Sequence, residues 1–276
     1  MTELYRGFLN FFEIVKADTP ELLEKVYKIR YQVLCVEKRL PGFDAFNHPN
    51  QMEIDEYDRH SSHILLRYRL TGEYIGTVRL ILSDFTNLNK LWPVQIYGNV
   101  DSEICDIKQL PSEQTAEISR FVVVSQFDRR KGDRRKPELV ADKGELLERR
   151  STDSATAGER RATDSATAGE RRATDRRTAP NIALALMAGV VMMSVDCNIR
   201  YWLSVMDPAL NRLLSYDGLE FNAIGPVIDY HGLRRPYYVR MQDVLCRMRL
   251  DHYDAWEVVT NCGEYDPFSC KSNILI

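Results

Sequence analysis

The chain has 276 residues, of which 44% are hydrophobic and 28% are charged, a composition typical of a globular protein and not of a fibrous or wholly disordered one. We expect one domain of about 200 residues, or two small ones. With 37 Lys and Arg against 40 Asp and Glu, the formal net charge is −3. Such a surface has no basic field that could neutralise a phosphate backbone, which argues against nucleic-acid binding.

Neither a membrane span nor a secretion signal is predicted. The longest uncharged apolar stretch, Ile182 to Val195, is shorter than the roughly 20 residues needed to cross a bilayer, and it predicts a core helix. The N-terminus mixes acids and bases and lacks a small-residue cleavage site, so we expect a cytoplasmic protein with no integral membrane segment. The six cysteines include no C-x-x-C spacing; we expect reduced, mostly buried thiols and no metal site.

The first elements can be read in chain order up to residue 124. Thr19-Pro20-Glu21 predicts a helix start, and apolar residues follow at helical spacing to about Glu37. Residues 38–62 are loop-like, rich in Pro, Gly, Asn and His. Segments 63–70 and 74–82 alternate like strands around Thr71-Gly72, which predicts a hairpin. A further strand is predicted over 117–124.

A low-complexity block then interrupts the chain. Residues 151–161 read STDSATAGERR, residues 162–172 read ATDSATAGERR, and a broken third copy follows to residue 180. Almost nothing in these repeats is large and apolar, so they cannot bury a core. With the residues before them they form a segment of 15 basic and 11 acidic residues. We therefore expect one acidic folded domain with a flexible insertion at about 128–180, tolerated as a surface loop.

The elements after the insertion alternate between helix and strand. A helix is expected over 182–197, a strand over 199–206, and a second helix from Asp207-Pro208 to just before Gly218. Strand-like stretches at 221–228 and 237–239 precede a final amphipathic stretch over about 242–259. A hairpin followed by strands separated by helices predicts an α/β or α+β domain with a mixed sheet, and the insertion falls on a strand-to-helix connection.

Charged residues occur where a core is otherwise expected. Arg30 borders the apolar face of the first helix, Asp55 and Asp58 precede the first hairpin strand, and Arg79 interrupts the second. Burying an unpaired charge costs several kcal/mol, so each of these groups needs a partner or a solvated cleft. One interpretation is a structural network in which Arg79 pairs with Asp55 or Asp58.

The predicted strand that contains EISRF, residues 117–121, also carries charged residues where a core is otherwise expected. Alternation places Glu117 and Ser119 on one face and Arg120 on the other. A carboxylate on a central strand that faces a cleft can act as a general base, because burial raises its pKa toward neutrality.

Three separated motifs then bear a family resemblance. IRYQVLCVE, then DEYDRHSSHILLRYRLTGEYIGTVRLIL, then EISRF together resemble the acyl-homoserine-lactone (autoinducer) synthases. They are more similar to the related N-acyl amino acid synthases and exosortase/PEP-CTERM-associated acyltransferases, and the opening segment 5–37 looks most like the exosortase branch. The resemblance covers about 1–127 and 179–260, and it implies the GNAT acyltransferase fold with a mixed central sheet flanked by helices, in a single domain spanning 1–276.

The resemblance also implies the site residues. Glu117 and Ser119 are the catalytic candidates, with Glu117 as general base acting through water and backbone N–H groups of Ser119 to Val124 as donors to the oxyanion. Residues that match the family's other charged positions would bind substrate: Arg30, Asp55, Asp58, Arg79 and Arg120. Arg79 or Arg30 would hold an acceptor carboxylate, with a purely structural role as the alternative for Arg30, and the two aspartates would order the loop over the acceptor pocket.

The predicted acyl donor is a thioester of phosphopantetheine, and no bound cofactor is expected. GNAT enzymes that use acetyl-CoA hold its pyrophosphate on a Gly-rich turn, whereas this chain reads SQFDRRKGDRRK there. This departure favours an acyl carrier protein over CoA, and the acidic carrier would dock on a basic segment, formed by Arg129, Arg130, Lys131, Arg134 and Arg135. The alternative is a solvated loop. Phe121 and Met206 would line an acyl tunnel, or would be plain core.

The sequence thus predicts an N-acyltransferase that moves a long-chain acyl group from acyl carrier protein to the amine of an amino acid or related small molecule. An autoinducer synthase using S-adenosylmethionine is one alternative, although the tryptophan that those synthases carry shortly after the first arginine is missing from VLCVEKRLPGF. The other alternative is a GNAT-fold binding protein that has lost catalysis. A ligand-sized cleft beside Glu117 would favour the enzyme, and a sealed sheet would favour the binding protein.

Overall fold

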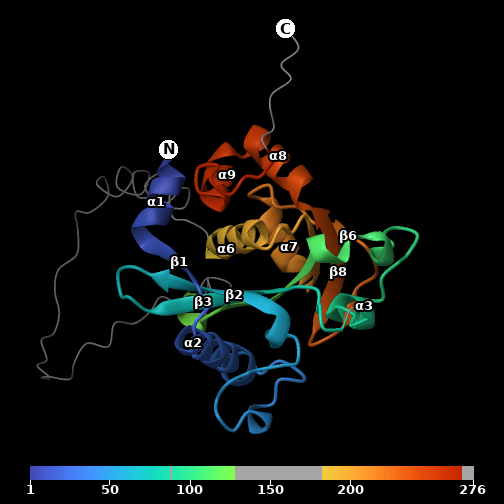
Figure 1. Cartoon of the computed structure of the whole chain (residues 1–276). Helices are drawn as coiled ribbons and strands as arrows, with labels where there is room; N and C mark the ends of the chain where they lie inside the picture. Colours follow the sequence, from blue (N-terminus) through green and yellow to red (C-terminus); the bar gives the residue numbers. More distant parts are fainter. Residues whose placement is uncertain (88, 128–181, 269–276) are drawn as a thin grey trace, which may run out of the picture.

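The computed structural model describes residues 1–87, 89–127 and 182–268. The predicted insertion therefore lies outside the described residues. Within them, a mixed sheet has the strand order β1-β2-β3-β4-β5-β8-β6, with β7 paired to β8, and helices cover both of its faces (Figure 1). The pairing of β4 with β5 is parallel, while the neighbouring pairs are antiparallel, which confirms the predicted mixed sheet. The strands are β1 (Phe12–Lys16), β2 (Ser61–Tyr68), β3 (Tyr74–Ile81), β4 (Thr115–Val123), β5 (Tyr201–Met206), β6 (Asn222–Ala223), β7 (Ile228–Asp229) and β8 (Leu233–Arg240).

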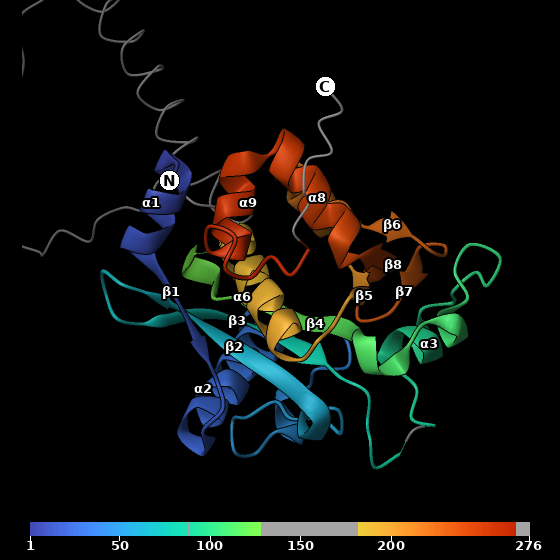
Figure 2. The same cartoon turned by 45° about the horizontal axis from the view of Figure 1, so that its top comes forward.

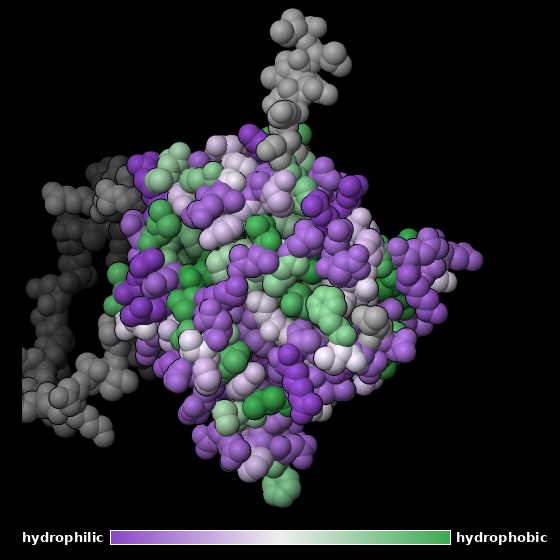
Figure 3. All heavy atoms as spheres, viewed as in Figure 1, coloured by the Kyte–Doolittle hydropathy of each residue, from purple (hydrophilic) through white to green (hydrophobic). Residues whose placement is uncertain are grey.

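The helices form two layers of unequal size. Helix α2 lies on one face of the sheet, and α1, α6, α8 and α9 lie on the other (Figures 1 and 2). Their bounds are α1 (Glu3–Phe11), α2 (Pro20–Tyr31), α3 (Pro93–Tyr97), α6 (Ile182–Asp196), α7 (Pro208–Ser215), α8 (Met241–Asp251) and α9 (Tyr253–Thr260). Neither α1, β1 nor α3 was predicted from the sequence. On the face seen in Figure 3, apolar residues occur in small separate groups among hydrophilic ones.

The predicted start of the first helix is confirmed. The Thr19 side chain accepts a hydrogen bond from the Leu22 backbone N–H, and Pro20 occupies the first helical position, where a missing N–H costs nothing. Helix α2 ends at Tyr31, and the chain continues as a π-helical turn over Gln32–Glu37. The predicted amphipathic stretch over 242–259 is two helices, because His252 leaves the helical region with φ −137° and ψ 53°.

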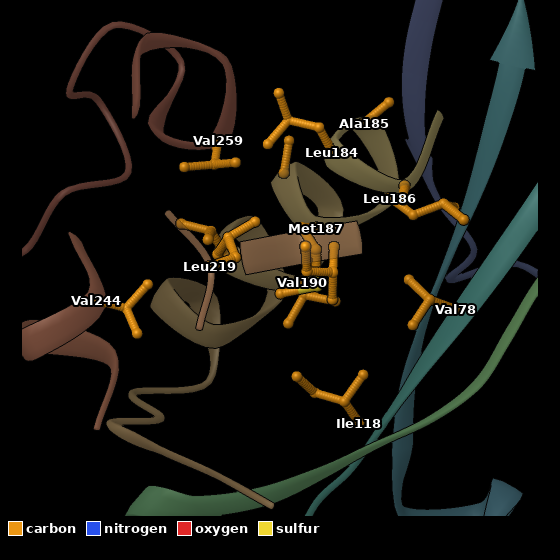
Figure 4. Packing of buried hydrophobic residues seen from close by; sticks show 14 of the residues in the cluster. Val78, Ile118, Leu184, Ala185, Leu186, Met187, Val190, Leu219, Val244 and Val259 are labelled. Atoms are coloured by element: carbon orange, nitrogen blue, oxygen red, sulfur yellow. The ribbon is translucent and has the colours of Figure 1, made fainter. Parts of the chain in front are cut away.

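Helix α6 forms the centre of the core (Figure 4). It is apolar around its whole circumference because it is buried on both sides: Val78 and Ile118 of the sheet lie on one side, and Val244 and Val259 of α8 and α9 lie on the other. The prediction of a core helix here is confirmed. None of the described helices is long and apolar enough to cross a membrane.

Two expectations need correction. Of the free cysteines described, Cys35 is buried, Cys105 and Cys197 are partly buried, and Cys262 is exposed, so the prediction of mostly buried thiols is wrong. Cys246 is disulfide-bonded, which contradicts the prediction of a reduced thiol there.

Strand β4 is irregular at its middle, and this irregularity positions the site. In its register with β3, Ser119 lies opposite Arg79 but Val122 lies opposite Thr77, so β4 has one extra residue. Such a β-bulge bends the strand and leaves backbone groups without a ladder partner. Arg120 lies in the bulge with φ 50°. On its other side β4 pairs with β5 only as far as Ile118, so the sheet opens at Ser119.

Candidate active site

A cavity of about 330 Å³ lies at this opening of the sheet. Its two sides differ in chemistry. The residues contributed by α6, α7, β5 and the loop before β6, with two from β4, are mostly apolar; they include Ile118, Phe121, Met187, Met206, Leu210, Leu214 and Phe221. The residues contributed by β3, the bulged part of β4 and the nearby loops are mostly polar; they include Asp55, Tyr57, Arg79, Glu117, Ser119, Arg120 and Tyr230. Such a cavity fits a ligand with an apolar chain and a polar reacting group.

Three arginines and three carboxylates beside the cavity form a closed hydrogen-bonded ring, which we call the charged ring. In cyclic order its members are Arg30, Glu53, Arg120, Asp55, Arg79 and Asp58. The N···O distances are 2.5 Å for Arg30–Glu53, 2.9 Å for Glu53–Arg120, 2.8 Å for Arg120–Asp55, 2.6 Å for Asp55–Arg79, 2.8 Å for Arg79–Asp58 and 2.6 Å for Asp58–Arg30. Positive and negative groups alternate around the ring, so its formal charge is zero when all six groups are ionised.

The charged ring joins segments that are distant in the sequence. Arg30 comes from α2, Arg79 from β3 and Arg120 from β4, and the carboxylates come from the segment between α2 and β2. The predicted pairing of Arg79 with Asp55 and Asp58 is present. Because buried ion pairs lose the solvation of both partners, removing one member leaves an uncompensated charge and costs several kcal/mol.

The predicted orientation of Arg120 is wrong. Simple alternation places it on the face opposite Ser119, yet Arg120 hydrogen-bonds to Glu53 and Asp55 and lines the cavity together with Ser119. The extra residue in the bulge resets the alternation, and the left-handed backbone of Arg120 turns its side chain into the ring. Its guanidinium also lies 4.8 Å from the ring centroid of Phe43.

Glu53 belongs to the ring but was missed by the sequence reasoning. It is 2% exposed. Burial alone would raise its pKa, but the charges of Arg30 and Arg120 outweigh this effect and lower the pKa to about 2. Burial likewise opposes ionisation of Asp58, and Arg30 is the main group that holds the pKa of Asp58 well below its usual range. Both carboxylates are therefore ionised at neutral pH. No periodic pattern in the sequence marks Glu53 as buried, because it lies in a loop segment beside other acidic residues.

Glu117 has the opposite environment. It is 2% exposed and lies outside the charged ring. Burial raises its pKa to about 7, although a hydrogen bond from the Val94 backbone N–H and the charge of Arg79 both act to lower it. The Val94 nitrogen lies 2.8 Å from Glu117 Oε2. A carboxylate with a pKa near neutrality that lines a cavity is suited to general-base catalysis, which is the property expected from the sequence.

Ser119 connects the ring to the cavity. Its Oγ accepts a hydrogen bond from Arg79 Nε at 2.9 Å, directly across the β3–β4 register. Arg79 is 1% exposed and is itself held by two carboxylates of the ring. The side chain of Ser119 therefore has a fixed position at the point where β4 and β5 separate.

The described parts of the predicted substrate-binding set are brought together, with different degrees of access. Arg30 is fully buried, and its three side-chain nitrogens donate to Glu53 and Asp58, which favours the structural alternative. Asp55, Arg79 and Arg120 line the cavity. The basic residues predicted to dock a carrier protein lie outside the described residues: Arg129, Arg130, Lys131, Arg134 and Arg135.

Aromatic residues around the cavity were also missed. The ring of Tyr230 stacks on Tyr97 of α3 with centroids 4.7 Å apart. His231 lies next to Phe43, at 4.7 Å between centroids, and its Nδ1 lies 2.5 Å from the Pro41 carbonyl oxygen. These contacts join the turn between β7 and β8 to the loop after α2. No motif marks these residues, because they meet only through the fold.

His63 lies behind the ring, buried on β2. Burial is the main cause that lowers the pKa of His63 to about 3, with the charge of Arg30 acting in the same direction. Its Nε2 is 3.6 Å from Asp58 Oδ1, and neither ring nitrogen has a hydrogen-bond partner among the described residues. His63 is therefore neutral and adds no charge to the site.

Comparisons with known proteins agree on the fold. A family model of the acetyltransferase (GNAT) domain matches residues 29–135, which include every member of the charged ring, Ser119 and Glu117. A search of curated proteins finds no match.

Several solved structures are similar to this chain. The CoA-dependent acyl-homoserine lactone synthase BjaI, with SAM and isopentyl-CoA, is 16% identical over 91% of this chain and 99% of that chain, with a TM-score of 0.50. TofI in a ternary complex with an inhibitor and MTA is 17% identical over 88% and 99%, also with a TM-score of 0.50. FeeM, an N-acyl amino acid synthase from uncultured soil microbes, is 12% identical over 88% and 97%, with a TM-score of 0.44.

At these identities the similarity establishes the architecture. The family match, the mixed sheet and the opening between β4 and β5 agree with one another. The chain has a GNAT fold, and the match to an acetyltransferase domain supports an acyltransferase.

Proposed function

We propose that the protein is an N-acyltransferase that moves a long-chain acyl group from acyl carrier protein to the amine of an amino acid or a related small molecule. The observation that carries this proposal is the two-sided cavity at the opening between β4 and β5. Its apolar side suits an acyl chain, and its polar side holds a buried carboxylate whose pKa lies near neutrality. Ser119, which lines the cavity, is the first residue of β4 beyond its pairs with β5.

The reaction divides between these sides. The amine nitrogen attacks the thioester carbonyl carbon, a C–N bond forms and the C–S bond breaks. Ionised Glu117 accepts one proton of the amine, directly or through one water. The carrier's sulfur departs as a thiolate and takes that proton back from Glu117, which leaves the thiol and an ionised Glu117. General-base assistance of this kind contributes roughly 10²- to 10⁴-fold in rate.

The carbonyl oxygen becomes an oxyanion and needs hydrogen-bond donors. Of the backbone N–H groups predicted for this role, that of Val124 donates to the Ile75 carbonyl at 2.9 Å and is therefore occupied. Arg120 and Phe121 have no partner in the β3–β4 register and lie beyond the β4–β5 pairs. Their N–H groups, which the bulge releases from the ladder, are the better candidates.

The charged ring has a positioning role in this proposal. It fixes the bulge through Arg120 and fixes Ser119 through Arg79. It also leaves Glu117 as the described carboxylate that lines the cavity with a pKa near neutrality. Arg79 and Arg120 line the cavity. The Arg79 side chain is 1% exposed and held by Asp55 and Asp58, whereas that of Arg120 is 17% exposed, so a carboxylate of the acceptor would bind on Arg120.

The test combines purified protein with two donors and two classes of acceptor. Acyl carrier protein and CoA carry the same acyl chain, and the acceptors are a mixture of amino acids or S-adenosylmethionine. We expect N-acyl amino acids from the carrier-bound donor, detected by mass spectrometry. A lactone formed from S-adenosylmethionine would instead identify the autoinducer synthase alternative. Absence of any product with all four combinations would contradict the proposal and favour a binding protein.

The carrier preference has its own test. If residues 129–135 receive an acidic carrier, KM for that donor rises between about 0.05 and 0.5 M salt, because the Debye length shrinks several-fold over this range. Charge reversal at Arg129, Arg130, Arg134 and Arg135 raises KM for the carrier-bound donor with little change in kcat. Equal KM values for the wild type and this variant would mean that the carrier docks elsewhere. The exosortase association rests on the opening segment 5–37 and stays a prediction.

A further inference from the structure

Two hydrogen-bond donors on the polar side of the cavity lack an acceptor among the described residues. Arg120 donates from Nε and Nη2 to Glu53 and Asp55, and its Nη1 donates to no group in the described part of the chain. The hydroxyl of Tyr230 likewise forms no hydrogen bond within that part. Both residues line the cavity, so a ligand in the cavity is placed to supply the missing acceptor.

The ring of Tyr230 is held by neighbouring rings. It stacks on Tyr97 with centroids 4.7 Å apart, and the centroid of His231 lies 4.3 Å from it. His231 in turn lies 4.7 Å from Phe43, and the ring centroid of Phe43 lies 4.8 Å from the guanidinium carbon of Arg120. A continuous row of ring contacts therefore connects Tyr230 to Arg120 on the polar side of the cavity.

The two free donors suit an anion. Burial raises the pKa of Tyr230 to about 12, while the charge of Arg120 acts to lower it and that of Glu117 acts to raise it. The phenol is therefore protonated at neutral pH and donates. Arg120 is already shared between two carboxylates of the charged ring, so its attraction for a further anion is partly cancelled. The hydroxyl of Tyr230 adds a donor that does not depend on a net charge.

The chemistry of the acceptor fits these positions. Glu117 lines the same cavity and accepts the amine proton in the proposed function. In an α-amino acid only the α-carbon lies between the amine and the carboxylate, so an amine beside Glu117 keeps the carboxylate on the polar side of the cavity. A carboxylate only accepts hydrogen bonds, whereas a carboxamide in its place brings two donors of its own.

We infer that Tyr230 is a specificity-determining residue whose hydroxyl donates a hydrogen bond to the carboxylate of the acceptor, beside a second one from Arg120 Nη1. This inference rests on the proposed function and narrows its acceptor to an α-amino acid with a free carboxylate. No bond is made or broken at Tyr230, so the proton balance of acyl transfer is unchanged.

The test measures kcat and KM with the carrier-bound donor for the standard amino acids and for their α-carboxamides. Tyr230→Phe removes the hydroxyl and keeps the ring that stacks on Tyr97. We expect KM for the amino acid to rise about 10- to 100-fold, the effect of a hydrogen bond to a charged group, with kcat within a few-fold of the wild type. KM for the carboxamide should change much less. Comparing the KM ratio of the two acceptors between the two proteins cancels the lower basicity of the carboxamide's amine.

Tyr97→Phe is the matched control, because Tyr97 is the other ring of the stack and is not among the described residues that line the cavity. Its KM ratio should equal that of the wild type. An unchanged ratio in Tyr230→Phe, whether both KM values stay the same or rise equally, would overturn the inference while wild-type turnover leaves the proposed function standing. An equal change of the ratio in Tyr97→Phe would also overturn it. Lack of wild-type turnover with every amino acid and carboxamide would contradict the proposed function itself.

Discussion

Two buried glutamates in the same site have pKa values that differ by about five units. Glu53, between two arginines, has a pKa of about 2, and Glu117, outside the charged ring, has a pKa of about 7. Both are 2% exposed. Burial raises the pKa of each, and the adjacent charges of Arg30 and Arg120 reverse this effect at Glu53 but not at Glu117. Distinct environments of this kind assign a structural role to one carboxylate and a proton-accepting role to the other.

The first prediction concerns Glu117→Gln, which keeps the size of the side chain but cannot accept a proton. In the wild type, kcat should rise with pH and level off above an apparent pKa near 7, because the base must be ionised. The variant should have no measurable turnover at any pH between 6 and 9. A pH profile measured with saturating acceptor checks this.

The same pKa gives a prediction for stability. A carboxyl whose folded pKa is raised stabilises the fold at low pH, and this contribution is lost as pH rises through the folded pKa. Relative to Glu117→Gln, the wild type should therefore lose roughly 3 kcal/mol between about pH 4.5 and pH 7. Urea unfolding of both proteins at several pH values measures this difference. A difference that does not change with pH would mean that Glu117 titrates normally.

Arg79→Lys tests the role of the ring. Lysine cannot donate to Asp55, Asp58 and Ser119 together in the geometry of a guanidinium, so we expect a lower melting temperature and a reduced kcat with little change in acceptor KM. Lys16→Arg, at an exposed pair with Asp196, is a control for a charge-conserving exchange. If the acceptor KM instead rises strongly at unchanged stability, Arg79 binds the acceptor carboxylate directly.

For single residues, the sequence predicted the identity of the charged site residues better than the orientation of their side chains. Glu117 on a strand among apolar residues indicated a buried carboxylate, and the predicted pKa near neutrality agrees with the structure. Arg120 was assigned to the wrong face because period-two alternation assumes a regular strand. Glu53 could not be predicted, since only the fold brings its segment between Arg30 and Arg120.

Among the helices and strands, β4 is the one most directly involved in the candidate site. Its first half pairs with both neighbours, its middle bulges and its second half separates from β5. The paired half holds Glu117 rigidly, the bulge turns Arg120 into the ring, and the separated half leaves space that apolar residues of α6 and α7 line. In the proposed function, this one strand carries the base and the backbone oxyanion donors and borders the space for the acyl chain.

The fourth prediction tests the apolar side of the cavity. Met206 on β5 lines it, and Met206→Phe places a stiffer, bulkier side chain in the space for the acyl chain. We expect the preference to shift toward shorter chains, with about 10-fold or more lost per methylene that no longer fits. Competition between donors of different chain length measures the shift. Met193→Phe, a buried change on α6 away from the cavity lining, should leave the preference unchanged even if stability falls.

Most elements could be predicted where a cap, a turn or a clear period marks them. Thr19-Pro20, Thr71-Gly72 and Asp207-Pro208 each mark a boundary that the structure contains. Short elements fixed by tertiary contacts were missed, such as α3, whose Val94 N–H donates to Glu117. No sequence pattern marks the opening between β4 and β5, because the opening is the place where these two strands stop pairing.

The largest of four hydrophobic clusters among the described residues surrounds α6. Both ends of the described chain contribute to it: Tyr5 and Phe8 come from α1, and Val258 comes from α9. This core therefore depends on contacts between residues that flank the 128–181 segment. The insertion predicted over about 128–180 lies outside the described residues, and its composition contains few residues able to join such a core.

The fifth prediction follows for the whole molecule. Removal of residues 137–177, with the ends rejoined by a short Gly/Ser linker, should leave melting temperature and turnover largely unchanged, because the entropy of loop closure varies slowly with length. Thermal unfolding and the acyl-transfer assay on the shortened protein check this. Failure of the shortened protein to fold would mean that the repeats pack on the domain.

The most direct measurement of the central claim, that this cavity joins an acyl chain to an amine with Glu117 as base, is mass spectrometry of lipid extracts. Cells that overproduce the wild-type protein are compared with cells that overproduce folded Glu117→Gln at the same level. We expect N-acyl amino acids with long chains in the first extract and background amounts in the second. Equal amounts of such products in both extracts, or none in either, would contradict the claim.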